Sequence, residues 1–347
     1  MAQSFPKFAV KAVMSLPTPV LRLMSGGGVV YQGGRTLDPH FQFLTAAAKA
    51  LPPIYTLSAQ AGRAASAAGL KSVAGKRDPG VKVEDFTIDG PGGAIPLRSY
   101  RPINQDPKAP VMVFAHFGGG VIGDLETCDA FCSIIARVAR CAVVSVDYRL
   151  APEHKWPSGL DDVLAAYRWT RDNAERFGAP AGHVAIGGDS MGGNFSAILA
   201  QEMKRNGEPQ PAVQLLIYPA VDVSSETQSM ITYADAYPLS RPIMDWFMGH
   251  YMGPDADPTN VRLSPIKETD LSGLAPAIVI TAGFDPLVDQ GECYAHRLKE
   301  AGVPVIYRCY DGLAHGFTAF TGAVPCADTA CREIAGFVRQ AYDGMLH

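Results

Sequence analysis

Short apolar runs separated by longer helical segments constrain the fold of this chain more than any other feature. The runs are residues 110–116, 141–150, 183–190, 212–221, 276–285 and 303–312, and the candidate helices lie near 126–139, 158–177, 192–205 and 288–302. A continuous apolar run is typical of a strand buried on both faces, and strands that alternate with helices form parallel sheets. The sequence therefore predicts the α/β class: a mostly parallel central sheet with helices on both faces, preceded by a hairpin over residues 81–102.

Two segments depart from this alternation. Residues 223–262 are rich in aromatic residues and methionine and contain no clear strand. In the N-terminal segment, Asp38 followed by Pro39 is typical of a helix start. We expect both segments to form a helical cap above the carboxyl ends of the strands. The predicted division is 1–55 for the first part of the cap, 223–262 for its second part, and 56–222 with 263–347 for the α/β core.

The composition argues against several classes of protein. The 30 basic and 34 acidic residues give a net charge of −4, which argues against nucleic-acid binding through a general positive field. No stretch approaches 18 consecutive apolar residues, so we expect no stable membrane insertion. Lys7, Lys11 and Pro17 interrupt the N-terminal apolar residues, so we expect no secretory leader and a cytoplasmic protein. A peripheral amphipathic helix at the N-terminus stays open.

The 7 cysteines, an odd number in a long chain, favour reduced thiols and no metal site.

The strongest chemical signal is the pentapeptide Gly188-Asp189-Ser190-Met191-Gly192. An apolar run precedes it and a helical segment follows it, which is the strand–turn–helix context of a nucleophilic serine. Small neighbours permit the strained turn that exposes the serine hydroxyl. The next amide, that of Met191, and the start of the helix then face a developing oxyanion. Ser190 is therefore the predicted nucleophile.

A serine hydroxyl needs a base, and the base needs a carboxylate to orient it. His315 follows the last apolar run in a loop flanked by glycine, which is where α/β sheets place reactive groups. We therefore predict His315 as the base. The other histidines after the nucleophile are His250 in the insertion, His296 in a predicted helix and His347 at the C-terminus.

The orienting acid should lie between nucleophile and base in the sequence. Asp285 directly follows an apolar run and is the predicted acid. Asp289 better fits the first turn of the next helix, where a carboxylate stabilises the helix dipole. Asp161 and Asp162 precede the nucleophile and are predicted to be exposed helix residues.

A second set of oxyanion donors is predicted in the loop His116-Phe117-Gly118-Gly119-Gly120, which follows an apolar run. Glycine leaves its amide accessible, so Gly118 and Gly119 are the predicted donors together with the amide after the nucleophile. A phosphate-binding glycine loop is the weaker reading, because no Gly-Lys-Ser/Thr follows.

Six motifs follow one another along the chain: HFGGGVIGD (116–124), DYRLAPEHKWP (147–157), GGDSMGGN (187–194), LSPI (263–266), DPLVD (285–289) and HGF (315–317). Together these motifs resemble those of the hormone-sensitive-lipase-like family of α/β-hydrolases, the bacterial family IV esterases. The resemblance implies an α/β-hydrolase fold with a cap, no metal and no cofactor, and hydrolysis of short-acyl carboxylic esters through an acyl-enzyme. It also implies a small-molecule ester as the substrate and a homodimer through the sheet edge near the C-terminus. Lactones, amides or aryl esters, or a non-catalytic ligand-binding role, are the alternatives.

The sequence departs from the family pattern at the oxyanion loop. The family has His-Gly-Gly-Gly followed by an aromatic residue, whereas here Phe117 carries the aromatic ring and Gly120 stands in its place. We therefore expect an altered substrate pocket involving Phe117, Gly120 and Asp189, with space left open at Gly120. Met191 replaces the family's usual alanine and is expected to crowd the pocket.

Two further groups are predicted to be structural. Tyr148, Arg149 and Glu153 fit a buried arginine–carboxylate pair better than a catalytic role. The aromatic and methionine residues of 230–252 are predicted to form the core of the cap, with some of them lining the acyl pocket.

Overall fold

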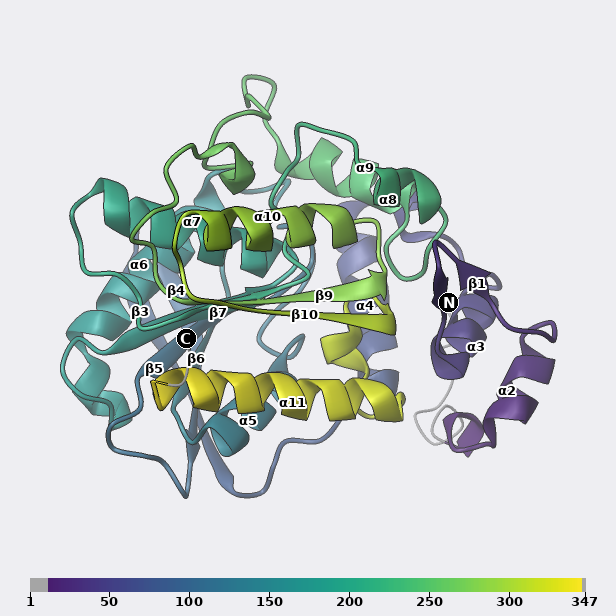
Figure 1. Cartoon of the computed structure of the whole chain (residues 1–347), viewed down its shortest axis with the longest axis horizontal. Helices are drawn as coiled ribbons and strands as arrows, with labels where there is room; N and C mark the ends of the chain where they lie inside the picture. Colours follow the sequence, from purple (N-terminus) through teal and green to yellow (C-terminus); the bar gives the residue numbers. More distant parts are fainter. Residues whose placement is uncertain (1–11, 345–347) are drawn as a thin grey trace.

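A sheet of eight strands runs through the molecule in the computed structural model, which describes residues 12–344 (Figure 1). Its strands are β3 (Val81–Gly90), β4 (Gly93–Pro102), β5 (Val111–Ala115), β6 (Val143–Val146), β7 (Val184–Asp189), β8 (Gln214–Ile217), β9 (Ala277–Phe284) and β10 (Val305–Ala314). They lie in the order β10-β9-β8-β7-β5-β6-β4-β3. The pairs β3–β4 and β4–β6 are antiparallel and the others are parallel. The predicted hairpin and mostly parallel sheet are confirmed.

Helices cover both faces of the sheet, with α6, α7 and α10 on one face and α5 and α11 on the other (Figure 1). Their bounds are α5 (Asp129–Ala139), α6 (Ser158–Asp172), α7 (Met191–Arg205), α10 (Val288–Glu300) and α11 (Pro325–Tyr342), with shorter turns η2 (Ala174–Phe177), η3 (Pro265–Lys267) and η4 (Phe317–Phe320). Along β5, Val111 and Val113 join the cluster with α6 and α7, whereas Met112 and Phe114 join the cluster with α5 and α11. Because both faces are covered, the strand has no polar side and appears in the sequence as a continuous apolar run.

The carboxylate of Asp162 on α6 is buried, so the prediction that it is exposed is wrong. Its side chain is 1% exposed and accepts hydrogen bonds from Arg149 Nε at 2.8 Å and Nη2 at 2.9 Å. Arg149 therefore pairs with a carboxylate, in line with a structural role, but the arginine is only half-buried and its partner is Asp162. Glu153, which was grouped with Arg149, pairs with Arg63 instead. The neighbouring Asp161 is 37% exposed and pairs with Arg262.

The two segments predicted to form a cap lie at the same end of the molecule, to the right and upper right in Figure 1. The N-terminal segment contains α2 (Thr18–Met24), β1 (Tyr31–Gln32), β2 (Arg35–Thr36), α3 (Pro39–Ala48), η1 (Ile54–Thr56) and α4 (Ala59–Val73). The insertion contains α8 (Gln228–Thr232) and α9 (Arg241–Tyr251), and residues 223–262 form no strand, as predicted.

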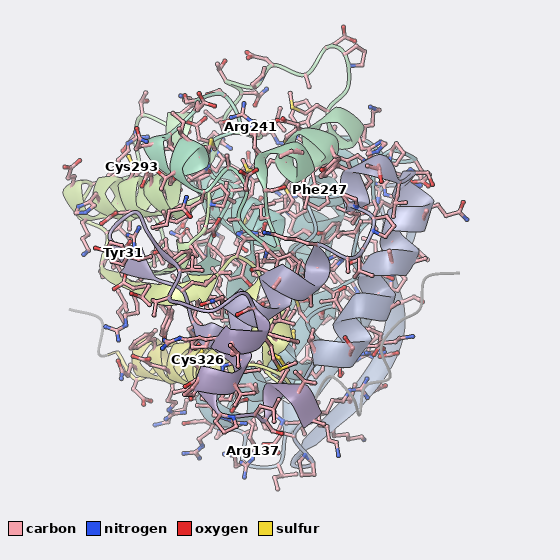
Figure 2. All side chains as sticks on the ribbon, turned by 90° about the vertical axis from the view of Figure 1, so that its right-hand side faces the viewer. Tyr31, Arg137, Arg241, Phe247, Cys293 and Cys326 are labelled. Carbon is pink, nitrogen blue, oxygen red and sulfur yellow. The ribbon has the colours of Figure 1, made fainter. Side chains whose placement is uncertain are left out.

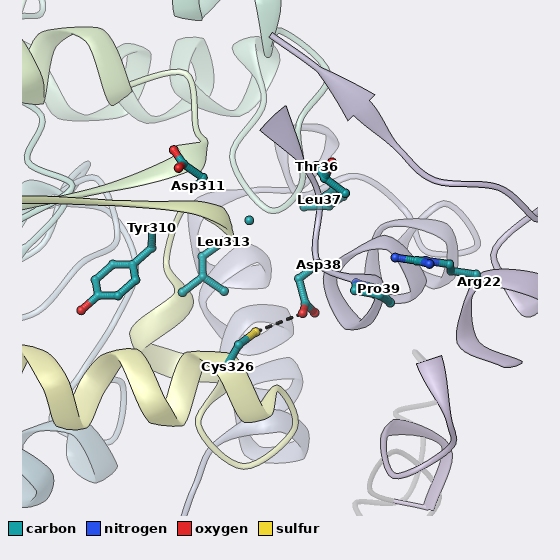
Figure 3. A pocket seen from close by; sticks show the side chains of 10 residues that line it. Arg22, Thr36, Leu37, Asp38, Pro39, Tyr310, Asp311, Leu313 and Cys326 are labelled. Carbon is teal, nitrogen blue, oxygen red and sulfur yellow. Dashed lines mark hydrogen bonds between the residues drawn. The ribbon is translucent and has the colours of Figure 1, made fainter. Parts of the chain in front are cut away.

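Asp38 joins the N-terminal segment to the core. Its carboxylate accepts from the His40 amide at 2.8 Å, which confirms the predicted helix start. The Asp38 amide donates to Gly312 O at 2.9 Å, and the Cys326 thiol donates to the Asp38 carboxylate at 3.1 Å. Figure 3 shows the Asp38–Cys326 contact at the wall of a surface hollow of about 380 Å³ that contains no residue of the predicted catalytic set. These bonds attach α3 to β10 and α11.

The two cap segments contact each other through α4 and α9. Trp246 Nε1 donates to Leu57 O at 3.1 Å. The Trp246 ring packs so closely on α4 that a Cβ on Gly62 would lie 3.1 Å from it. The cap boundary at residue 55 stays a prediction. The helix α4 follows that residue and packs on α9.

Some expectations are not tested by this structure. Lys7 and Lys11 lie outside the described residues, so the question of a peripheral N-terminal helix stays open. The strand β10 forms the sheet edge near the C-terminus. A homodimer through this edge also stays a prediction. Of the helices that the structure describes, none is long and apolar enough to cross a lipid bilayer.

Candidate active site

Ser190 lies at a sharp turn between β7 and α7, with φ 55° and ψ −113°. A positive φ at a residue other than glycine costs about 1–3 kcal/mol, so the surrounding structure has to hold it in place. A Cβ on Gly188 would lie 2.3 Å from the Gly192 carbonyl carbon, and a Cβ on Gly192 would lie 1.9 Å from Ala115 O. The predicted strand–turn–helix context is confirmed. Backbone atoms leave no room for a side chain at Gly188 or Gly192, the glycines that flank the turn.

The structure brings Ser190, His315 and Asp285 together at the carboxyl edge of the parallel sheet. The His315 Nε2 atom is 2.9 Å from Ser190 Oγ, and His315 Nδ1 is 2.7 Å from Asp285 Oδ2. The other Asp285 oxygen accepts from the Leu287 amide at 2.8 Å, which fixes the carboxylate plane. All three side chains are buried. They meet because β7, β9 and β10 run in the same direction, so the residues that follow them lie at one edge.

The remaining acid and base candidates lie elsewhere. The His250 ring on α9 packs on Trp246 with centroids 4.7 Å apart, and His296 is exposed on α10. His347 lies outside the described residues. Asp289, in the first turn of α10, accepts from a backbone amide of α8 at 2.7 Å. It therefore connects the insertion to the core.

The glycine loop after β5 presents free amides near the end of β7. Among the residues that the structure describes, the amides of Gly118 (φ +129°) and Gly119 (φ +61°) donate to no backbone or side-chain acceptor. The amide of Met191 lies in the first turn of α7, where an amide has no partner within its own helix. The Met191 side chain is 2% exposed and belongs to the hydrophobic cluster with α6 and α7. These amides have the free donor capacity that an oxyanion hole needs.

Aromatic side chains of α9 cover this loop. A Cβ on Gly119 would lie 2.4 Å from the Phe247 ring, and a Cβ on Gly120 would lie 2.6 Å from the Tyr251 ring. Phe247 is labelled on α9 in Figure 2. The expectation that Gly120 leaves open space is therefore wrong, because the Tyr251 ring fills that space. Phe117 is half-buried against the hydrophobic cluster that includes α5 and α11.

Asp189 is fully buried behind the nucleophile, so the expectation that it lines the substrate pocket is wrong. Its carboxylate accepts from Tyr218 Oη at 3.0 Å and Thr318 Oγ1 at 2.7 Å, and Cys128 Sγ lies 3.5 Å away. Burial raises the pKa of Asp189 to about 6. Thr318 follows His315 closely in the sequence, so Asp189 ties the nucleophile turn to the loop of the base. Tyr218 and Thr318 were not predicted from the sequence, although Tyr218 directly follows β8 at the edge where site residues gather.

His116 orients the glycine loop and is a poor candidate for a base. Burial lowers its pKa to about 4, so the imidazole is neutral near pH 7. Its Nδ1 atom is 2.7 Å from Phe117 O, and its ring stacks on Tyr148 with centroids 4.2 Å apart. The Tyr148 hydroxyl donates to His116 O at 2.8 Å, in line with its predicted structural role. Within residues 12–344, no group of three or more histidine, cysteine, aspartate or glutamate side chains is arranged to hold a metal ion.

Comparison with known proteins gives consistent matches. A protein family described as alpha/beta hydrolase fold matches residues 112–319, which is more than half of the chain. The carboxylic ester hydrolase LipN of Mycobacterium tuberculosis is 41% identical over 318 residues, which cover 89% of this chain and 84% of that protein. An ethyl acetate hydrolase of Pseudomonas putida is 35% identical over 280 residues, which cover 80% of this chain and 88% of that protein.

A solved structure agrees with these matches. An alpha/beta hydrolase enzyme from the metagenome of Lake Arreo, Spain, determined as a serine-to-alanine mutant, superposes with a TM-score of 0.86 at 40% sequence identity. The match covers 88% of this chain and 99% of that chain.

Proposed function

The chain belongs to the hormone-sensitive-lipase-like esterases of the alpha/beta hydrolase fold and is a carboxylic ester hydrolase, and we propose that Ser190, His315 and Asp285 are its catalytic triad. One observation carries this proposal. A continuous hydrogen-bonded chain runs from Ser190 Oγ through the His315 ring to Asp285, with distances of 2.9 Å and 2.7 Å. This is the arrangement in which a serine hydroxyl can be deprotonated as it attacks.

In the first half of the reaction, His315 Nε2 accepts the proton of the Ser190 hydroxyl as Oγ attacks the ester carbonyl carbon. The carbonyl oxygen becomes an oxyanion and accepts hydrogen bonds from the amides of Gly118, Gly119 and Met191. Asp285 accepts from His315 Nδ1, which fixes the tautomer and stabilises the imidazolium. His315 then donates its proton to the leaving alcohol as the carbon–oxygen bond breaks, and the acyl group stays on Ser190.

In the second half, water replaces the alcohol. His315 accepts a proton from the water as it attacks the acyl carbon, and the same amides stabilise the second oxyanion. Collapse of this intermediate returns the proton from His315 to Ser190 Oγ and releases the carboxylic acid. The enzyme is thereby restored.

For the substrate we infer esters with short acyl groups. The Phe247 ring lies in contact with Gly119, which restricts the space above one of the proposed oxyanion donors. The similarity to an ethyl acetate hydrolase supports the same size class. p-Nitrophenyl acetate and butyrate should therefore be hydrolysed faster than the decanoate, and activity confined to lactones or amides would contradict this inference.

Replacement of the proposed nucleophile tests the triad. Ser190→Ala should lower kcat for p-nitrophenyl butyrate by roughly ten-thousandfold or more, because no other group can form the acyl-enzyme. Ser145→Ala is the matched control, since it makes the same change at a buried serine of β6. Circular dichroism and thermal melting check that both variants fold. If a folded Ser190→Ala variant kept its turnover, the assignment of the nucleophile would be wrong.

A further inference from the structure

One arginine of the N-terminal segment bonds to the backbone on either side of the contacts that the oxyanion loop makes. Arg63 lies on α4, and its Nε donates to Val121 O at 2.8 Å. Its Nη2 donates to Ala151 O at 2.7 Å. The Ala151 amide in turn donates to Gly120 O at 2.8 Å. A single planar guanidinium therefore fixes two backbone stretches that enclose the glycine loop.

Val121 belongs to the turn that begins with a proposed oxyanion donor. The amides of Val121 and Ile122 both donate to Gly118 O at 3.0 Å. The plane of the peptide after Val121 is set by Arg63, and the turn transmits this constraint to Gly118. The rings of Phe247 and Tyr251 on α9 pack directly against Gly119 and Gly120 of the same loop.

Glu153 pairs with Arg63 but contacts neither of the two backbone carbonyl groups. Its Oε1 accepts from Arg63 Nη1 at 3.0 Å and its Oε2 accepts from Nη2 at 2.5 Å. The guanidinium lowers the pKa of Glu153 to about 2, so the carboxylate is ionised at any pH at which the protein would be assayed. An arginine can serve all of these partners at once because its donors lie in one plane at fixed angles, which a lysine cannot reproduce.

We propose that Arg63 is a positioning residue of ester hydrolysis, which aims the amides of Gly118 and Gly119 at the developing oxyanion by fixing the carbonyl groups of Val121 and Ala151. Arg63 touches no reacting atom and acts through the backbone of the loop. This inference rests on the proposed triad and oxyanion hole, and it gives a segment of the cap a role in the chemical step. Nothing in the sequence marks Arg63, because its partners lie 58 and 88 residues away.

The test is Arg63→Met, which keeps most of the apolar stem and removes every donor. The matched control is Arg168→Met, which removes an arginine that pairs with a single glutamate, Glu208, at 2.7 Å and contacts no catalytic loop. A second variant, Glu153→Gln, removes the carboxylate charge but leaves both bonds from Arg63 to the backbone. If Arg63→Met does not fold, Arg63→Lys takes its place, since it keeps the charge but cannot donate to both carbonyls.

We expect Arg63→Met to lower kcat per active site by roughly tenfold to hundredfold, because oxyanion donors that are misaimed lose part of their stabilising effect. KM should change by less than about threefold, because the ground-state ester makes weaker use of these donors. Affinity for a trifluoromethyl ketone, whose adduct with Ser190 carries an oxyanion, should fall by the same factor as kcat. In Arg168→Met and Glu153→Gln, kcat and inhibitor affinity should stay within about threefold of the parent enzyme.

Active sites are counted by stoichiometric phosphonylation, and Tm is measured for each variant. If Arg63→Met, or Arg63→Lys in its place, lowers Tm but keeps kcat per active site and inhibitor affinity, Arg63 is merely structural and the inference is overturned. The triad is judged separately by Ser190→Ala. Suppose that Ser190→Ala is inactive while Arg63→Met has the same kcat per active site and inhibitor affinity as Arg168→Met. The positioning role of Arg63 would then be wrong, and the proposed function would still stand.

Discussion

The nucleophile turn and the oxyanion loop both depend on glycine, but different parts of the chain hold them. At the nucleophile turn, the atoms that exclude a side chain at Gly188 and Gly192 belong mainly to the backbone of the core. At the oxyanion loop, the atoms that face Gly119 and Gly120 belong to side chains of α9 in the cap. The nucleophile is thus fixed by the folding of the central sheet, whereas the oxyanion loop also requires a docked cap.

This difference fits a chain whose nucleophile turn follows the expected pattern while its oxyanion loop departs from it. A backbone contact cannot be altered by replacing one residue, so the glycines beside Ser190 have no local substitute. A contact with a ring can be altered by replacing the ring. In this chain the aromatic residue of the loop is Phe117, and the Tyr251 ring fills the space at Gly120.

The largest effect is expected at Gly192. Gly192→Ala would place a Cβ 1.9 Å from Ala115 O, so the nucleophile turn and β5 would have to separate. We expect the free energy of unfolding to fall by about 3 kcal/mol or more, with loss of esterase activity. Urea unfolding and p-nitrophenyl butyrate hydrolysis measure the two effects.

The control for this change is Gly336→Ala on α11, where nothing lies within 4 Å of the added Cβ. There the same substitution should raise the free energy of unfolding by about 0.5–1 kcal/mol, since alanine favours the helix. Equal effects of the two substitutions would show that backbone packing at the nucleophile turn is looser than described.

A smaller and reversible effect is expected at Gly119. Gly119→Ala should lower kcat by roughly hundredfold, because the Cβ displaces either the loop or the Phe247 ring. Removing the ring in Gly119→Ala/Phe247→Ala should restore kcat by roughly tenfold. The restoration is partial because the added Cβ still lies 2.8 Å from the Cβ of residue 247 and alanine still adopts a positive φ. Steady-state kinetics of both variants and of Phe247→Ala alone complete the cycle. A double variant no better than Gly119→Ala would mean that the cap does not set this geometry.

The smallest effect is expected at the buried carboxyl group of Asp189, which precedes the nucleophile. The pKa of Asp189 is raised from 3.8 to about 6 by burial, so the folded state prefers the protonated form. Its contribution to stability is present below about pH 4 and is lost as the pH rises through about 6. Between about pH 4.5 and about pH 7, the free energy of unfolding of the parent protein should fall by about 2 kcal/mol relative to Asp189→Asn. Urea unfolding at both pH values measures this change, and parallel pH profiles for the two proteins would contradict it.

Patterns within short stretches of sequence predicted most of the core. The apolar runs indicated β5 to β10, because a strand buried on both faces has to be apolar throughout. The catalytic candidates followed from where each lies relative to a strand, and the structure brings Ser190, His315 and Asp285 within hydrogen-bonding distance. The prediction for Asp162 was wrong because the helix pattern alone does not show that the buried face of α6 contacts Arg149, which pairs with this carboxylate.

The sequence by itself determined the α/β class, the turn at Ser190 and the identity of the catalytic candidates. These features depend on the local alternation of apolar runs and on residues next to strand ends. Only the tertiary structure decided which side chains surround them. Tyr218 and Thr318 bond to Asp189, Phe247 and Tyr251 pack on the glycine loop, and Arg63 donates to the carbonyl group of Val121 next to that loop. These contacts join residues far apart in the chain, and no short-range pattern specifies which distant side chain packs against a given backbone.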